Sequence, residues 1–195
     1  MTARQQILDK LRQSKARDAV APPGNATPVP ATALPTDRRA LTEIFIERAR
    51  ASGADVQFAH SEDQLIETFL QAGTGALTTP EQQLHQQFPT ATQYGVEGQR
   101  ILVRADAAIA ETGTLCLQSA QVPSRSLFLC EHLLVLVEAA DILPCQEDYW
   151  HRYPQNSARA VHLITGPSRT ADVEQTLQIG AHGPRTLTCL VVQNS

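Results

Sequence analysis

Short apolar runs alternate with amphipathic helical patterns from residue 36 onward, and this alternation is the feature that most limits the fold. Strands that alternate with helices pack as layers, in which helices flank a mostly parallel sheet. The sequence therefore predicts an α/β fold. The predicted helices are 37–52, a segment that begins at Ser61, 81–88 and 145–153, and the predicted strands are 54–59, 75–79, two long apolar segments at 100–119 and 126–143, and 186–192.

Residues 161–184, VHLITGPSRTADVEQTLQIGAHGP, predict a strand that passes through a Gly-Pro-Ser-Arg-Thr turn into a helix. Ser168 or Thr170 fits the cap of that helix, whose apolar side carries Val173 and Leu177. A helix that begins directly after a strand is also where many α/β proteins hold an anionic ligand. Two interpretations are open, an ordinary capped helix or an anion site.

The N-terminal part of the chain has a different pattern. Residues 4–17 predict an amphipathic helix, and residues 20–35 hold five of the twelve prolines without periodicity, which predicts an extended linker. A helix this short is marginal by itself. We therefore expect an arm at 1–35 and a globular domain at 36–195. The arm is expected to dock on the body or on a neighbouring subunit of a homo-oligomer.

The composition excludes several classes of partner. The 195 residues carry a net charge of −4 without a basic run, so we expect no nucleic-acid partner. No segment approaches the roughly 18 consecutive apolar residues of a membrane span, and the N-terminus lacks the apolar stretch of a signal peptide. These features predict a cytoplasmic protein without a membrane span.

Residue usage limits the cofactors in the same way. The four cysteines include no Cys-x-x-Cys pair, and the histidine spacing does not suit a metal, so neither an iron–sulfur nor a zinc motif is present. The only lysines are Lys10 and Lys15, so the globular part has no lysine for pyridoxal phosphate (PLP) or for a Walker A loop. No flavin or NAD motif occurs. The cofactor is therefore unknown, and no metal is expected.

The turn Glu111-Thr112-Gly113-Thr114 joins two apolar strands. Gly113 can take the positive φ that such a turn needs. A carboxylate beside buried strands is costly unless it is hydrogen-bonded or used, and desolvation would raise its pKa. Glu111 is therefore a candidate general base or nucleophile. The alternative is that Glu111 accepts hydrogen bonds from turn N–H groups or is exposed at the tip.

Charged residues elsewhere give mixed indications. Arg169 is a counter-charge for an anion at the start of the predicted helix, whereas Asp172 and Glu174 complement the helix dipole and would weaken an anion site. His182 is a candidate acid or base, although a lone histidine is more often structural. Arg125, in a polar loop before an apolar strand, is either a carboxylate ligand or a solvated arginine.

Three segments together resemble a known family. ADAAIAETGTLCL, SRSLFLCEHLLVLV and TGPSRTADVEQTLQIGAHGPRTLTCLVV, in this order and spacing, are similar to the LUD (lactate-utilisation) domain family, over roughly the last two-thirds of the chain. The resemblance implies the NagB/RpiA/CoA-transferase-like α/β fold. The family motif residues that it carries over are Glu111, Thr112, Gly113, Thr114, Gly166, Pro167, Ser168, Thr170, Ala171, Asp172, Glu174, Gly180, His182, Gly183 and Pro184.

The resemblance also implies a role in oxidising L-lactate to pyruvate together with iron–sulfur partner subunits. Since this chain has no redox cofactor motif, the electron transfer is expected to belong to those partners or to an unrecognised cofactor. This subunit would bind a small carboxylate or organise the complex, and whether it is itself an enzyme is left open. The alternatives are a stand-alone enzyme on a sugar phosphate or CoA thioester, with Glu111 as the catalytic glutamate, and a structural module.

Glu111 and the Ser168 turn both follow predicted strands, so we expect the two loops to line one crevice. Glu111 and His182 are the candidate catalytic residues. The candidate ligand-binding residues are Thr112, Gly113, Thr114, Arg125, Gly166, Ser168, Arg169, Thr170, Asp172, Glu174 and Gly183.

Overall fold

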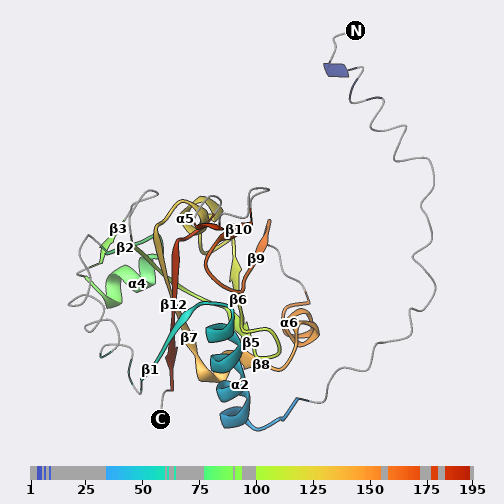
Figure 1. Cartoon of the computed structure of the whole chain (residues 1–195). Helices are drawn as coiled ribbons and strands as arrows, with labels where there is room; N and C mark the ends of the chain where they lie inside the picture. The colour runs from blue at the N-terminus through green and yellow to red at the C-terminus, as the bar shows by residue number, and fades with distance from the viewer. Residues whose placement is uncertain are drawn as a thin grey trace. The chain divides into compact units, whose positions relative to one another are not determined.

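Figure 1 shows the computed structural model of the chain. Contacts divide the chain into two units, Met1–Ala33 and Leu34–Ser195. In the first unit residues 4, 5, 7 and 9 are helical, and the remainder of the expected helix and most of the expected linker lie outside the described residues. The structure describes residues 4, 5, 7, 9, 34–59, 61, 64, 77–89, 91–93, 100–154, 158–171, 177–179 and 183–193.

A six-stranded sheet forms the centre of the second unit, and every neighbouring pair of its strands is parallel. Both faces of this sheet are covered, which explains why β7 and β12 are apolar at successive positions and do not alternate. In spatial order the strands are β1 (Asp55–Ala59), β12 (Thr186–Val192), β7 (His132–Glu138), β4 (Arg100–Arg104), β2 (Leu77–Thr79) and β3 (Thr92–Gln93).

A second sheet of four strands packs beside the first, with one parallel and two antiparallel pairs. Its strands, in spatial order, are β8 (Ile142–Leu143), β5 (Ala107–Ile109), β6 (Thr114–Gln118) and β9 (Val161–Ile164). A separate antiparallel hairpin consists of β10 (Arg169–Ala171) and β11 (Leu177–Ile179).

The helices fill the spaces between and outside the sheets. Successive residues of a strand point to opposite faces, so the six-stranded sheet contributes to two cores. On one face Val135 shares a core with Phe45 of α2 and Leu115 of the second sheet. On the other face Leu134 packs with Leu84 of α4. The helices are α2 (Arg38–Ala51), α4 (Gln82–Gln87), α5 (Ser124–Phe128), the 3₁₀ turn η1 (Ala139–Asp141) and α6 (Gln146–Arg152).

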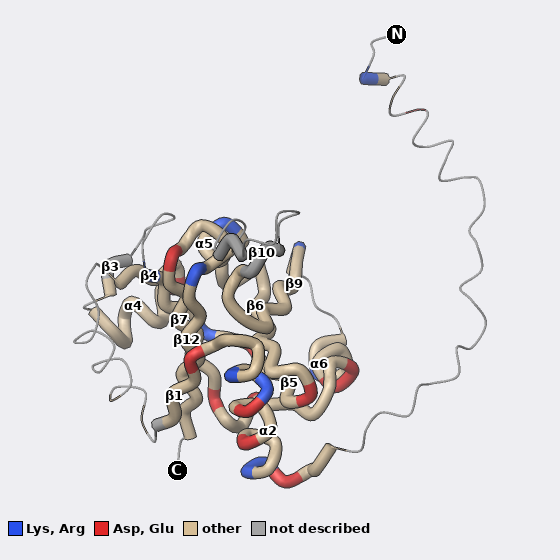
Figure 2. The backbone as a smooth tube through the Cα atoms, in the orientation of Figure 1, with Lys and Arg blue, Asp and Glu red and all other residues tan. Residues whose placement is uncertain are grey.

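Helix α2 confirms the prediction for residues 37–52. The Asp37 carboxylate accepts a hydrogen bond from the Ala40 N–H at 2.9 Å, which caps the first turn. Gly53, with φ of 92°, follows the last turn. Basic and acidic residues both lie along this helix, whereas the central strands carry few charges (Figure 2). The helix therefore presents a mixed-charge outer side and an apolar inner side.

Two predictions about secondary structure were wrong. The start of the apolar segment at 126–143 is not a strand, because residues 124–128 form helix α5 with Leu127 buried. The helix predicted after Ser168 is also absent from the described residues there, since 169–171 and 177–179 are the strands of a hairpin. Ser168 therefore caps no helix at Arg169, and the argument for an anion at a helix N-terminus does not apply. The predicted helices 81–88 and 145–153 are confirmed by α4 and α6. Of the helix predicted from Ser61, only residues 61 and 64 are described, and the rest lies outside the described residues.

Candidate functional site

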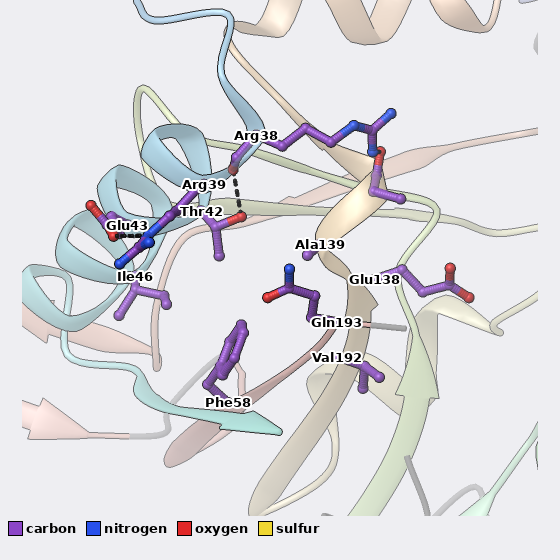
Figure 3. Close-up of a pocket in the computed structure, with 11 residues that line it drawn as sticks. Arg38, Arg39, Thr42, Glu43, Ile46, Phe58, Glu138, Ala139, Val192 and Gln193 are labelled. Carbon is purple, nitrogen blue, oxygen red and sulfur yellow. Dashed lines mark hydrogen bonds and ion pairs between the residues drawn. The ribbon is translucent and has the colours of Figure 1, made fainter. Parts of the chain in front are cut away.

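The carboxyl ends of the parallel strands lie at one edge of the six-stranded sheet, where open α/β sheets usually bind ligands. A cavity of about 560 Å³ lies at this edge, beside the last residues of β1, β12 and β7 and the N-terminal half of α2 (Figure 3). This volume is in the range of small-molecule sites. We call it the α2 pocket, and it is lined by Arg38, Arg39, Thr42, Glu43, Ile46, Phe58, Glu138, Ala139, Ala140, Val192 and Gln193.

The α2 pocket has a charged side and an apolar side. Arg38 donates from Nη1 to the carbonyl oxygen of Ala140 at 2.9 Å, and Arg39 pairs through Nε with Glu43 at 3.1 Å. Ile46 of α2 and the end of β1, with Phe58, supply apolar surface that faces the cavity. Phe58 is 42% exposed, so its ring is accessible from the cavity. The lining therefore combines two guanidinium groups, two carboxylates (Glu43 and Glu138) and an apolar surface.

A second cavity of about 420 Å³ lies at the same edge of the sheet, beyond the ends of β2 and β4. The Glu81 carboxylate, which follows β2, accepts a hydrogen bond from the Arg104 backbone N–H at 2.7 Å. Burial raises the pKa of Glu81 to about 7, against the lowering effect of that hydrogen bond and of the Arg104 charge. We call this cavity the β2–β4 pocket, and it is lined by Pro80, Glu81, Gln82, Gln83, Arg104, Ala105, Asp106, Gln121, Asp141 and Tyr153.

Asp106, the second carboxyl group of the β2–β4 pocket, is fixed by neighbouring groups. Its Oδ2 accepts a hydrogen bond from the Gln118 N–H at 2.8 Å, and the Tyr153 hydroxyl donates to its backbone carbonyl at 3.1 Å. Burial raises the pKa of Asp106, and the hydrogen bond from Gln118 opposes this. The pocket thus contains two carboxyl groups that are harder to ionise than usual, which is typical of groups used in acid–base chemistry.

One ion pair connects the two pockets. Arg104, at the end of β4, lies 3.5 Å from Glu138, at the end of the neighbouring strand β7. Arg104 lines the β2–β4 pocket and Glu138 lines the α2 pocket. The two cavities are therefore neighbours along one edge of the sheet.

The predicted turn at 111–114 lies on the second sheet, and neither pocket is lined by its residues. Glu111 and Thr112 are exposed, whereas Gly113 and Thr114 are buried. The Glu111 N–H donates to the Pro144 carbonyl at 3.0 Å. The exposed position of Glu111 matches the alternative in which this side chain lies at the tip of the turn.

The structure brings the start of the second predicted loop next to this turn. The Thr114 hydroxyl is hydrogen-bonded to that of Thr112 at 2.7 Å and to that of Thr165, which follows β9, at 2.9 Å. Both loops also contact the last turn of α2. A Cβ on Gly113 would lie 2.3 Å from the Ala49 nitrogen, and one on Gly166 would lie 2.5 Å from the Ser52 carbonyl oxygen. The two glycines therefore allow α2 to pack closely where the loops meet.

The remaining predicted residues occupy different places. Ser168 is half-buried, its N–H donates to the Pro184 carbonyl at 2.9 Å, and its side chain lies against Gly183. Arg169 and Thr170 belong to β10. Arg125 is exposed on helix α5. The prediction that it lies in a polar loop before a strand was therefore wrong. Asp172, Glu174 and His182 lie outside the described residues.

Sequence reasoning missed Glu81, Asp106 and Phe58. The helical pattern after Pro80 made Glu81 resemble an ordinary residue of a first turn, and its side chain makes no capping hydrogen bond. The signal that could have found Glu81 is that it closely follows the predicted strand 75–79, as ligand-binding residues of parallel sheets do. Asp106 lies inside the predicted apolar segment 100–119, and only the observed end of β4 at Arg104 places it after a strand. No group of three or more His, Cys, Asp or Glu side chains suited to a metal occurs in the described part of the chain. In the same part, no helix is both long enough and apolar enough to cross a bilayer.

Comparison with known proteins identifies the domain. Residues 97–192 match the family model described as LUD domain. Lactate utilization protein C of Bacillus pumilus is 32% identical over 100 residues, which cover 48% of this chain and 42% of that protein. The uncharacterized protein YkgG of Escherichia coli is 32% identical over 100 residues, which cover 48% of this chain and 43% of that protein. This chain thus matches less than half the length of these curated relatives.

A solved structure supports the fold. The crystal structure of a DUF162 family protein from Deinococcus radiodurans has a TM-score of 0.61 to this chain, with 17% sequence identity, and the match covers 81% of this chain and 99% of the other. At this identity the likeness concerns the fold alone. The family-model match and the relatives named lactate utilization protein C lead to one conclusion: residues 97–192 of this chain are a LUD domain.

Proposed function

We propose that this chain is a component of an L-lactate utilisation system, in which L-lactate is oxidised to pyruvate together with iron–sulfur partner subunits. The observation that carries this proposal is the LUD domain match, in the half of the chain that also matches relatives named lactate utilization protein C. The electrons would pass to the partners, because the four cysteines of this chain do not have the spacing of a cluster motif.

The contribution of this subunit is to bind a small carboxylate in the α2 pocket. Arg38 and Arg39 bring guanidinium groups to the rim of that pocket. A guanidinium has five N–H donors, so an arginine that already has a partner can also receive a carboxylate. The apolar surface of Phe58 and Ile46 suits the methyl group of a three-carbon acid. Lactate and pyruvate both have this combination of groups.

The loop surface around Thr112, Thr165 and Ser168 is the second candidate place for the carboxylate. Its hydroxyl groups can donate hydrogen bonds, but the exposed Glu111 carboxylate repels an anion and neither pocket is lined by these residues. We therefore favour the α2 pocket for the ligand and the motif loops for packing against α2 and for organising the complex. Glu111 is exposed and lines neither pocket.

Deletion and complementation test the proposal. A strain without the gene should fail to grow on L-lactate as its carbon source while growing normally on glucose. Wild type and Arg48→Gln should restore growth, because Arg48 is an exposed α2 residue that does not line the pocket. Arg39→Gln should restore growth poorly. Normal growth of the deletion strain on L-lactate would contradict the pathway role, and full rescue by Arg39→Gln would contradict only the carboxylate site.

The partner assignment has its own test. The tagged full-length chain should co-purify with iron–sulfur proteins from cells grown on L-lactate, and the recovered material should show the visible absorbance of clusters. A second form that lacks residues 1–33 should reveal whether the arm contributes. Unchanged oligomeric mass and partner recovery without the arm would contradict a role of the arm in assembly.

A further inference from the structure

The β2–β4 pocket is not used by the proposed function, although it contains Glu81 and Asp106, two carboxyl groups whose pKa is raised by burial. Its polar side chains come from separate elements. Glu81 follows β2, Arg104 ends β4, Asp106 comes two residues later, and Tyr153 follows α6. Groups that converge from distant parts of a chain onto one cavity form a built recess and not a local turn.

We propose that the β2–β4 pocket is a second ligand site, which takes a small uncharged polyhydroxylated molecule whose hydroxyl groups pair with Glu81, Asp106 and Arg104. This site depends neither on the α2 pocket nor on a role in lactate utilisation.

The charges of the pocket select against an anionic ligand. Glu81, Asp106 and Asp141 contribute three carboxyl groups, and Arg104 contributes the one guanidinium among the described lining residues. Arg104 lies beside Glu138, and Asp141 is paired with Arg152. Adding a carboxylate or phosphate to these groups would cost repulsion that the guanidinium does not offset.

The hydrogen-bonding capacity of the pocket suits hydroxyl groups. Carboxylates accept, guanidinium groups donate, and the Gln121 amide does both, so a ligand must offer donors and acceptors together. A hydroxyl group offers both on one atom. Glu81 uses Oε1 for the Arg104 N–H and has further lone pairs for a ligand hydroxyl. The volume of about 420 Å³ is enough for a ligand with several carbon atoms.

The site should respond to pH near neutrality. The groups that face Glu81 are Arg104 and Asp106. The pocket also holds Asp141 and Tyr153, and burial raises the pKa of the Tyr153 hydroxyl. A hydroxyl donates more strongly to an ionised carboxylate than to a neutral acid. Because the pKa of Glu81 is about 7, the ionised fraction falls by about a factor of ten between pH 8 and pH 6. The affinity for the polyol should fall by up to the same factor.

Erythritol is the probe, and chemical shifts of backbone amides in the isotopically labelled full-length chain report its binding. Erythritol should produce saturable shifts at residues of the β2–β4 pocket, whereas butane-1,4-diol, which has the same number of carbons and two fewer hydroxyl groups, should bind at least several-fold more weakly. Erythritol binding should weaken by several-fold from pH 8 to pH 6. The Glu81→Gln variant should lose this pH dependence, and the matched variant Glu131→Gln, at an exposed position outside the pocket, should keep it.

A measurement on the unmodified protein covers the case in which Glu81→Gln fails to fold. The carboxyl carbon of Glu81 should titrate near pH 7 without ligand and at a lower pH with saturating erythritol, because the ligand favours the ionised form. No saturable shift with erythritol, equal binding of butane-1,4-diol, an unchanged Glu81 titration, or an unchanged pH dependence in a folded Glu81→Gln variant would each overturn the proposal.

Discussion

Gly113→Ala should destabilise the protein more than Gly53→Ala, the same substitution at another turn glycine with a positive φ. Gly113 has a φ of 69°, in the left-handed region, which costs an alanine about 1–2 kcal/mol. In addition, the new Cβ would lie 2.3 Å from the Ala49 nitrogen and 2.6 Å from the Arg48 carbonyl carbon. Both are backbone atoms of α2, so no side chain can rotate away, and the helix itself must shift.

The size of the effect follows from these two costs. Forcing extra volume into a packed site costs about 1–3 kcal/mol, so Gly113→Ala should lower the free energy of unfolding by about 2–5 kcal/mol in total. Gly53→Ala is the matched control, because Gly53 has a φ of 92° but is exposed at the end of α2. That variant should show the backbone cost of about 1–2 kcal/mol alone.

Urea unfolding followed by circular dichroism measures both variants, with the free energies compared at equal m-values. The difference between Gly113→Ala and Gly53→Ala isolates the close approach of α2 to the turn. A difference below about 0.5 kcal/mol, well under the cost of overpacking, would refute the view that Gly113 is required by packing against α2.

Three further predictions use other parts of the molecule. The raised pKa of Glu81 makes its ionisation unfavourable in the folded state, so its contribution to stability is greatest below pH 4.5 and is lost as the pH rises through about 7. From pH 4 to pH 8, the free energy of unfolding of Glu81→Gln should therefore rise by about 1–3 kcal/mol relative to that of the wild type in urea unfolding. A difference that stays constant with pH would contradict this. Thr114→Val and Thr165→Val should each lower the free energy of unfolding by about 1 kcal/mol. In a double-mutant cycle the two losses should be less than additive, because both variants remove the same hydrogen bond. Strict additivity would argue against that bond. Cys145 is half-exposed, whereas Cys116, Cys130 and Cys189 are buried, so a thiol reagent should modify Cys145 in the folded protein and the other three only after denaturation. Rapid modification of all four in native buffer would contradict the burial.

The layered α/β fold could be predicted from sequence because its strongest signals are local. Asp37 and Gly53 mark the two ends of α2, and the apolar run in β7 is what a strand covered on both faces requires. The division of the strands into two sheets could not be predicted, because β5 and β6 are as apolar as β4 and β7. Only the choice of neighbouring strand assigns β4 and β7 to one sheet and β5 and β6 to the other.

The two errors of secondary structure have physical reasons. Residues 124–128 are too few for hydrophobic periodicity to distinguish a helical turn from a strand, and α5 buries Leu127 while Phe128 is 42% exposed. The prediction of a helix after Ser168 rested on its capping residues and acidic side chains, but residues 169–171 and 177–179 pair as the hairpin of β10 and β11. The local charge pattern therefore predicted a helix where the backbone forms a pair of hydrogen-bonded strands.

The site shows the same limit. A hydrogen bond between Thr114 and Thr165 joins the turn at 111–114 to the start of the loop at 165, and the end of α2 packs against both. The shared crevice expected there stays a prediction. No sequence pattern indicated the contact with α2, since residues 48–52 and 113 are far apart in the chain. Similarly, Glu81 acquires its raised pKa only because the fold buries it beside Arg104 and Asp106. Burial by distant residues is what sequence alone does not reveal.

The most direct test of the account is a crystal structure of the protein soaked with L-lactate. The account predicts electron density for the acid in the α2 pocket, with its carboxylate on Arg38 or Arg39 and its methyl group against Phe58. Density at the turn of Glu111 and Ser168 with an empty α2 pocket, or no bound acid at saturating concentration, would contradict the proposed ligand site.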